Sequence, residues 1–529
     1  MAQRFAGPLY SPTNVLEDRL LRSVIRLALC TALLTPAAAY AETIGPAQAQ
    51  ALQQQLKDWL GGLFGPSVKV PDLPVQITGE QDHYKFAVHV PGFEGPDGDV
   101  ASTANVRPLD GGRWSIDSVK APDSGSFTVT LPKTDDPDSG GPMKMHFTIG
   151  KQDSHGVIDP TLATDSNFHT EFGALVMQSE NPKQTSEQRI DRYVTDAALK
   201  PRKDGRLDFT STGTMEGWKS ANEVNGQTPM AFGAEKVQAT GHVDGINRAH
   251  VADLLAASGA LFGAMPDHAK GSDLTPAAKA QVRLMLAAMQ DLVTSVSMEE
   301  TLDGVQVEIA GMGGGTIKHL KMGFGGEAPD GILHAWLDIG LDGLDSPSMP
   351  PQIAGYLPKH FEIKPSLSGV KTADLQKLAQ DSTADNGGKD VATADLMAML
   401  SHGGANANLE ILSFDMGPAK VEGTGHFTAT SPSQWHGDAH VTATGFDDLM
   451  KQAHDDPDVA QALPVMIMLR GMAKPVGDRL VWDIVSDGPK LTVNGMDMSA
   501  LTGGADKPKA KPQATKPGPG AKPGQGVKP

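Results

Sequence analysis

The sequence predicts an α+β protein in which long antiparallel β-sheets carry amphipathic helices inserted between strands. Three observations favour this class: apolar and polar residues alternate in several segments after residue 74, apolar residues recur at helical spacing in others, and one order of elements recurs along the chain. Alternation with period two is typical of antiparallel strands with one apolar and one polar face. The recurring order indicates duplicated modules.

Residues 1–41 have the order of an export signal. Three arginines precede a short apolar run at 27–34, and Ala39-Tyr40-Ala41 places small residues where a signal peptidase cleaves. The run is far shorter than the roughly twenty residues that cross a bilayer as a helix. We predict a secretory signal peptide, cleavage after Ala41 and a periplasmic protein of the cell envelope.

Cysteine content and charge exclude several classes of function. Cleavage after Ala41 would remove the only cysteine, Cys30, and with it any disulfide, thiol nucleophile or cysteine metal site. The net charge of −18 repels phosphate backbones, and no basic stripe with interleaved aromatic residues is present, so nucleic-acid binding is not expected. No segment after the leader is apolar for eighteen residues, so no transmembrane span is predicted in the mature chain.

The region 42–230 is predicted to be mainly antiparallel β-structure behind an N-terminal helix. Leu52, Leu56 and Trp59 lie on one face of a helix expected at 47–64, which has few basic residues for a membrane surface and therefore indicates a packing helix. The strands expected after it are marked by alternating apolar residues, with Gly, Asp and Pro clusters at the turns. These residues are Tyr84, Phe86, Val88 and Val90; Phe127, Val129 and Leu131; Met143, Met145, Phe147 and Ile149; and Leu207 and Phe209.

A strand–helix–helix–strand module is predicted at 231–400. A strand ends in the sequence VQATG at 237–241 and precedes amphipathic patterns at 249–263 and from Thr275-Pro276 onward, and a strand pattern returns at 305–309. The methionines of the second helix are interpreted as core residues. A further strand-to-helix step is marked by LSG at 367–369 followed by 372–380.

A second similar module is predicted at 401–502. The sequence VTATG at 441–445 again ends a strand, helical patterns follow at 446–454 and 457–472, and strands return at 479–485 and 490–493. The tail at 503–529 contains six lysines among Pro, Gly and Ala, which predicts a disordered segment. We interpret it as a solvated tail, with contact to cell-wall polymer or envelope partners as the alternative.

Residues 405–500 carry a family resemblance. The run from Leu409 to Gly423, the strand GDAHVTATG that ends at Gly445, and the closing hairpin from Gly477 resemble an uncharacterised bacterial envelope family, filed as domain of unknown function 2125. Strand geometry and glycine turns carry the resemblance, and it brings no catalytic residue with it. It implies an exported, β-rich envelope protein.

The sequence offers no catalytic or cofactor motif. Walker, dinucleotide-binding, nucleophile-elbow and HExxH patterns are absent, so no catalytic residue and no cofactor are predicted. His426, His436 and His440 are the weak candidates for a metal site, because imidazoles on paired strands bind zinc if the register brings them together. The alternative, which we favour, places them on the solvated face of strands.

Three functional hypotheses follow, in order of preference. The first is a non-catalytic envelope protein that holds a lipid or another apolar ligand on an amphipathic β-surface. The second is a scaffold or interaction protein of the cell envelope. The third is a metal-dependent hydrolase that uses the three histidines. An open apolar groove along the sheet would favour the first.

Overall fold

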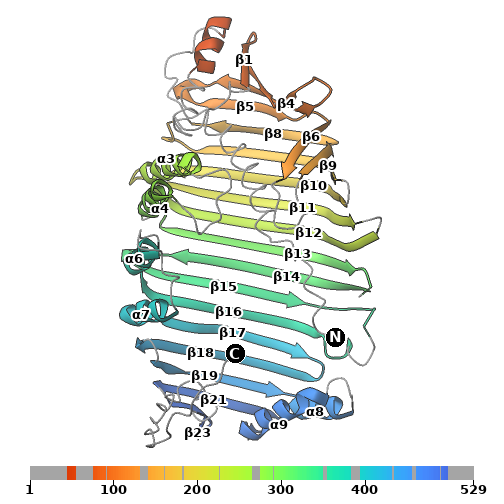
Figure 1. The fold of residues 1–529 in the computed structure, drawn as a ribbon, viewed down its shortest axis with the longest axis vertical. Helices are drawn as coiled ribbons and strands as arrows, with labels where there is room; N and C mark the ends of the chain where they lie inside the picture. The colour runs from red at the N-terminus through yellow and green to blue at the C-terminus, as the bar shows by residue number, and fades with distance from the viewer. Residues whose placement is uncertain are drawn as a thin grey trace, which may run out of the picture.

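In the computed structural model, the described residues form one antiparallel sheet of 23 strands. The structure describes residues 44–54, 75–90, 92–131, 141–159, 161–181, 184–224, 227–264, 275–289, 291–311, 313–349, 354–382, 393–431, 434–455, 460–488 and 490–498. The predicted signal peptide and the predicted tail lie outside these residues. The strands lie side by side along the long axis of the molecule, with helices at the edges of the sheet (Figure 1).

The elements follow in chain order. The N-terminal strands are β1 (Val75–Gly79), β2 (Tyr84–His89), β3 (Phe93–Glu94), β4 (Val100–Pro108), β5 (Trp114–Lys120), β6 (Ser124–Leu131), β7 (Gly141–Thr148) and β8 (Lys151–Ile158). The long strands are β9 (Ser166–Glu180), β10 (Gln184–Pro201), β11 (Leu207–Val224), β12 (Gln227–Ile246), β13 (Ser295–Ile309), β14 (Gly313–Glu327), β15 (Ile332–Asp342), β16 (Pro358–Lys371), β17 (Asn406–Met416), β18 (Ala419–Ser431) and β19 (Gln434–Thr444). The last strands are β20 (Lys474–Val476), β21 (Arg479–Gly488), β22 (Lys490–Val493) and β23 (Met496–Asp497). One helix, at 46–54, precedes the first strand. The later helices are α3 (Arg248–Ala264), α4 (Pro276–Met289), α6 (Thr372–Ser382), α7 (Thr393–Gly403), α8 (Phe446–Asp455) and α9 (Leu463–Met472). Short 3-10 turns lie at Asp110–Gly112, Pro329–Gly331 and Ala460–Ala462.

The predicted α+β class is wrong, because strands make up 62% of the structure and helices 21%. The fold is essentially all-β. The helices expected near 249–263 and from residue 276 are present as α3 and α4, but they connect neighbouring strands of one sheet. The strands reach 20 residues in β12, well above the usual five or six, so the sheet dominates the chain.

One row of paired residues on the sheet is apolar across twelve strands. Each member is in register with the next, so their side chains share one face, which we call the hydrophobic face. The row runs Phe172, Tyr193, Met215, Val237, Leu302, Leu320, Leu341, Phe361, Phe414, Val421, Ala443 and Leu480, from β9 to β21.

The next row, displaced by one residue, alternates basic and acidic residues on the opposite, polar face. It runs Arg192, Glu216, Lys236, Asp303, His319, Asp342, His360, Asp415 and Lys420 from β10 to β18. Several neighbours in this row are in direct contact: Nδ1 of His319 lies 2.7 Å from Oδ1 of Asp303, and Nζ of Lys420 lies 3.1 Å from Oδ2 of Asp415. Opposite charges on facing residues stabilise a strand pair and disfavour shifted registers.

A line of irregular residues crosses the sheet beside the apolar row, and we call it the crease. It consists of Ala174, Asp191, Gly217, Glu235, Gly304, Lys318 and Gly343, where the regular pairing is interrupted on successive strands. Every second member has a positive φ: 50° at Ala174, 64° at Gly217, 60° at Gly304 and 66° at Gly343. The intervening charged side chains lie against the glycines, in the space that a Cβ would fill.

The crease changes the spacing of the hydrophobic face. Met215 and Trp218, and likewise Leu302 and Val305, pack in one cluster although they are three residues apart instead of two. At the crease, each strand therefore has two consecutive residues on the polar side, one more than regular alternation would place there. A bulge bends its strand, so bulges aligned on neighbouring strands bend the sheet along the crease.

The helix pairs are inserted at three places between consecutive strands of the sheet: α3–α4 after β12, α6–α7 after β16, and α8–α9 after β19. Each preceding strand ends at or near a glycine with positive φ: Gly245, Gly369 or Gly445. A left-handed residue turns the chain sharply out of the sheet, and glycine adopts it without a steric penalty. The recurrence of strand, two helices and strand is observed, and its origin in duplicated modules stays a prediction.

The N-terminal strands form a separate small core around Tyr84, Phe86, Trp114 and Ile116. The strands predicted from Tyr84 and Phe86, from Phe127 and from Met143 are confirmed as β2, β6 and β7. The helix predicted at 47–64 is present at 46–54 within the described residues, and its Ala49 packs into this core. The core therefore covers the end of the long sheet that lies nearest β8 and β9.

Candidate ligand-binding face

The middle of the hydrophobic face leaves large apolar side chains exposed. Met298, Phe324 and Leu337 lie side by side on β13, β14 and β15, and Met322 lies next to Phe324 on the same face. The exposed fractions are 50% for Phe324, 43% for Met322 and 41% for Leu337. Isolated exposed apolar residues are ordinary, but contiguous ones mark surfaces that bind something.

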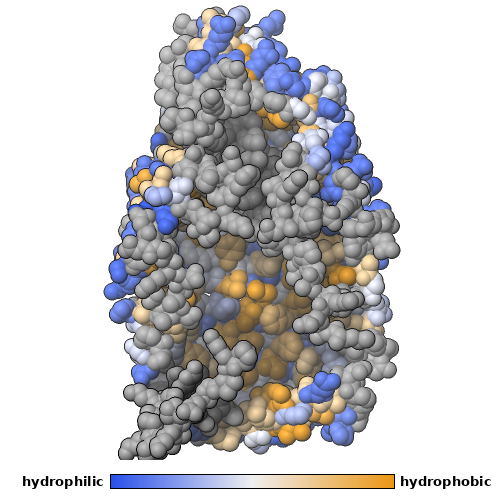
Figure 2. Space-filling model, viewed as in Figure 1, coloured by the Kyte–Doolittle hydropathy of each residue, from blue (hydrophilic) through white to orange (hydrophobic). Residues whose placement is uncertain are grey.

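This part of the face is hollowed, and its surface is dominated by hydrophobic residues (Figure 2). Helices α6 and α7 lie at one end of the strands, where Leu375 and Met399 pack on Leu333 and Val370 of the hydrophobic face. Helix α8 packs on the same face at the other end of the sheet, where the ring centroid of Phe446 lies 5.9 Å from that of Trp482. Among the described residues, these helices therefore border the face, and the apolar side chains at its centre stay partly exposed.

One charged residue lies among the apolar residues of the hydrophobic face. Glu300 on β13 lies between Ala239 of β12 and Met322 of β14, and its neighbours along the strand on this face are Met298 and Leu302. Its side chain is partly exposed. No hydrogen bond or ion pair joins it to another residue in the described part of the chain.

The three candidate metal ligands lie on the polar face of β18 and β19. His436 and His440 are four residues apart on an extended strand, which separates them by about 13 Å. Each imidazole has a partner of its own: Asp487 lies 2.9 Å from His436, Asp483 lies 2.7 Å from His440, and Asn408 is hydrogen-bonded to His426. Among the described residues, no group of three or more His, Cys, Asp or Glu side chains is placed to hold a metal ion. The register therefore pairs these histidines across strands and does not bring them to one point.

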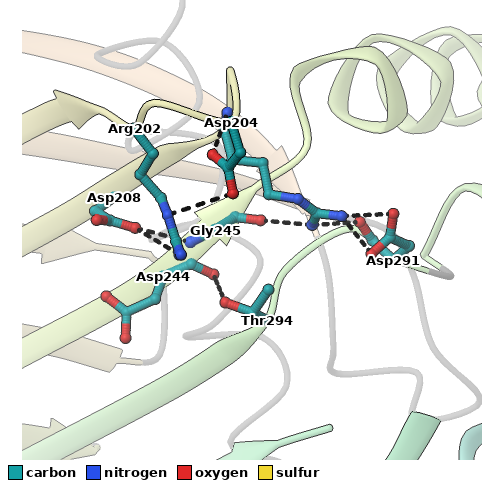
Figure 3. A network of polar contacts seen from close by, with 8 residues as sticks. Arg202, Asp204, Asp208, Asp244, Gly245, Asp291 and Thr294 are labelled. Carbon is teal, nitrogen blue, oxygen red and sulfur yellow. Dashed lines mark hydrogen bonds and ion pairs between the residues drawn. The ribbon is translucent and has the colours of Figure 1, made fainter. Parts of the chain in front are cut away.

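A polar network lies where β12 leads into α3 and α4 returns to β13 (Figure 3). Nη2 of Arg206 donates to both carboxylate oxygens of Asp291 at 2.6 and 2.7 Å, and its Nη1 donates to the carbonyl oxygen of Gly245 at 3.0 Å. The backbone N–H of Gly245 donates to Asp208 at 2.9 Å. An open pocket of about 760 Å³ adjoins this network, and most of its charged lining residues are acidic. The contacts join the strand ends to the helix pair, so we interpret the network as a structural junction.

The Arg206–Asp291 pair provides a test of that interpretation. Arg206 lowers the pKa of Asp291 in the folded state, so the pair stabilises the fold above the ordinary aspartate pKa of about 3.9 and is lost as the pH falls through the folded-state value. We expect Arg206→Met to lower the free energy of unfolding by about 1 kcal/mol at pH 7, because the carboxylate is half exposed and solvent screens the pair. Chemical denaturation of Arg206→Met, Asp291→Asn and the double variant should give a coupling that is present at pH 7 and vanishes in acid, once the pH lies below the folded-state pKa of Asp291. A coupling free energy that persists in acid would show that the ion pair between Arg206 and Asp291 is not its cause.

Sequence reasoning missed Glu300, although a signal was present. Val296, Met298 and Leu302 alternate, and Glu300 occupies the position in this alternation at which an apolar residue is expected. The crease was missed as well, because a single extra residue per strand resembles an ordinary irregularity until the strands are placed side by side.

The fold and the face define an all-β protein with an amphipathic sheet, one side of which is apolar and, in the described part of the chain, partly exposed. Residues 326–487 match the model of a family described as "Uncharacterized protein conserved in bacteria (DUF2125)", which confirms the resemblance predicted from the sequence. The match begins at the end of β14 and so extends upstream of the segment from which the resemblance was recognised. Searches of curated proteins and of solved structures gave no match. None of the described helices has both the length and the hydropathy to cross a membrane.

Proposed function

We propose that the protein holds the hydrocarbon part of a lipid, or another apolar ligand, on its hydrophobic face in the periplasm. The main support for this proposal is the exposed cluster of Met298, Met322, Phe324 and Leu337. Covering apolar surface is favourable by roughly 25 cal/mol per Å², and flexible methionine side chains adapt to ligands of varied shape. The predicted export signal supports the location.

The length and shape of the face also favour an extended ligand. The apolar row runs perpendicular to the strands from β9 to β21. In the hollowed middle of the face, Glu300 is the one charged residue among the described residues of this row and of the rows beside it on the same face. A hydrocarbon chain lying along such rows makes many weak dispersion contacts and no demand for hydrogen bonds. This arrangement fits an acyl chain better than a compact polar substrate.

Charge placed in the open cluster should abolish binding. We expect Met298→Glu combined with Phe324→Glu to weaken the uptake of a fluorescent fatty-acid analogue by at least about tenfold, because hydrocarbon would have to cover two carboxylates. Both positions are exposed, so the fold should tolerate the changes. Fluorescence titration of delipidated protein measures the effect.

The control carries its charge on the polar face of the same strand. Gln306→Glu on β13 is exposed and pairs with Gly233 and Thr316, and we expect it to bind like the unmodified protein. Equal loss in the control would point to a general charge effect. If native mass spectrometry of protein from the envelope shows no bound lipid and the delipidated protein takes up no analogue, the proposal is wrong and the scaffold hypothesis is left.

A further inference from the structure

We propose that Glu300 binds the ammonium group of an amphiphilic ligand whose hydrocarbon part lies on the hydrophobic face. This inference rests on the proposed function and adds the chemical class of the ligand. Three neighbouring rows of paired residues make up the hydrophobic face, and they run from Phe172 to Leu480, from Thr170 to Trp482 and from Phe168 to Leu337. Within these three rows, Glu300 is the one residue with a charged side chain.

The position of Glu300 excludes the usual role of a surface carboxylate. The neighbouring Glu299 points to the polar face, where its charge acts on Lys321. Glu300 instead has Ala239 and Met322 beside it and no described partner. An uncharged chain that covered this carboxylate would remove its hydration without replacing it, at a large cost in free energy. A ligand that supplies a positive donor avoids that cost.

Small residues lie on one side of Glu300 and bulky residues lie on the other. On one side, β11 and β12 present Ser211, Gly213, Ala239 and Gly241 in the two rows that contain Glu300 and Met298. On the other side, β14 and β15 present the bulky exposed residues Met322, Phe324 and Leu337. Small residues leave room for a head group beside the carboxylate, and the bulky ones contact a chain. The ligand is therefore oriented with its amine toward β12 and its chain toward β15.

An ammonium group suits this carboxylate better than the alternatives. A carboxylate only accepts hydrogen bonds, and charge-assisted bonds are about twice as strong as neutral ones. Another carboxylate or a phosphate brought to the same place would be repelled. Water leaves when hydrocarbon covers the neighbouring residues, and both the attraction and the repulsion grow as the local dielectric constant falls.

The test compares three amphiphiles with the same twelve-carbon chain: dodecylamine, which is protonated at pH 7, dodecanol and dodecanoate. The full chain, delipidated, is titrated by calorimetry below the micelle concentration of each compound. We expect the protein to bind dodecylammonium about tenfold more tightly than dodecanol, and dodecanoate more weakly than dodecanol. Glu300→Gln should remove the preference for the amine and leave the affinity for dodecanol within about threefold.

Glu299→Gln is the matched control, because it removes the same charge from the adjacent residue on the opposite face. We expect it to keep the preference, which separates a local contact from the general attraction of an acidic protein for cations. A preference that survives Glu300→Gln, or that Glu299→Gln removes equally, overturns the assignment. Binding of dodecanol without any amine preference overturns this inference alone, and failure of all three compounds to bind overturns the proposed function as well.

Discussion

Replacing Asp159 with alanine is expected to lower the free energy of unfolding by about 3 kcal/mol, since five hydrogen-bond donors in one turn lose a buried, charged acceptor. Asp159 is 2% exposed and lies in the turn between β8 and β9. Its carboxylate accepts hydrogen bonds from the backbone N–H groups of Thr161, Ala163 and Thr164 at 2.8, 3.1 and 2.7 Å, and from the hydroxyls of Thr161 and Thr164 at 2.7 Å each. Urea denaturation followed by tryptophan fluorescence measures the loss.

The same residue predicts a dependence on pH. Burial raises the pKa of the Asp159 carboxyl, but the hydrogen bonds from Thr161 and Thr164 outweigh it and hold the pKa below its usual value. A lowered folded-state pKa stabilises the fold above the unfolded value of about 3.9, and this contribution is lost as the pH falls through the folded value. The difference between Asp159→Ala and the unmodified protein should therefore shrink in acid. Asp165→Ala, which changes an exposed carboxylate in the same turn, should have little effect at either pH, and an equal loss there would refute the assignment.

Gly445→Ala is expected to lower the free energy of unfolding by about 3 kcal/mol. The residue has φ of +67°, which costs about 1–2 kcal/mol for an alanine, and a Cβ at this position would lie 2.0 Å from the carbonyl oxygen of Pro418. That obstacle is backbone and has no rotamer with which to escape, so overpacking adds a similar amount. Unfolding is followed by the fluorescence of Trp482. The ring of this residue lies against that of Phe446, which directly follows Gly445.

Gly477→Ala separates the two causes. Gly477 has φ of +65°, and a Cβ there would meet no atom within 4 Å. We expect this variant to lose only about 1 kcal/mol, which is the cost of the left-handed backbone alone. Equal losses at both glycines would mean that the contact with Pro418 relaxes freely.

The positions of many elements could be predicted from local sequence, but the fold class could not. Alternation identified β2, β6 and β7, and the sequence at 441–445 correctly marked the end of β19 before a helix pair. The strand end predicted at 237–241 was wrong, because β12 continues to Ile246 before its helix pair begins. The α+β prediction failed because clean alternation covers only parts of each long strand. Polar rows and glycines such as Gly217 and Gly304 interrupt the pattern, so strands of 15 to 20 residues were read as shorter ones.

The candidate site shows the same division between local and non-local information. An amphipathic β-surface was predicted because one face of each strand is apolar along its own sequence. Which residues stay uncovered depends on the neighbours that the register supplies. Phe324 is half exposed whereas Leu302, on the adjacent strand and the same face, is buried in a cluster. The histidine hypothesis depended on an unknown register in the same way, and the pairing with Asp483 and Asp487 could not be read from residues more than forty positions away.

The crease restricts how this sheet tolerates insertions and deletions. Because each strand contributes one additional residue at the same level, deleting that residue from a single strand shifts everything beyond it by one position. In β13, loss of Gly304 would move Val305 and every later residue one position out of register with their present neighbours on β12 and β14, so that Val305 and Val307 no longer lie beside Ile317 and Phe232. The insertion or deletion of one residue at the crease is thus compatible with the fold only if every strand that the crease crosses changes in the same way. Length variation in related chains is therefore expected at the hairpins and helix pairs and not along the strands.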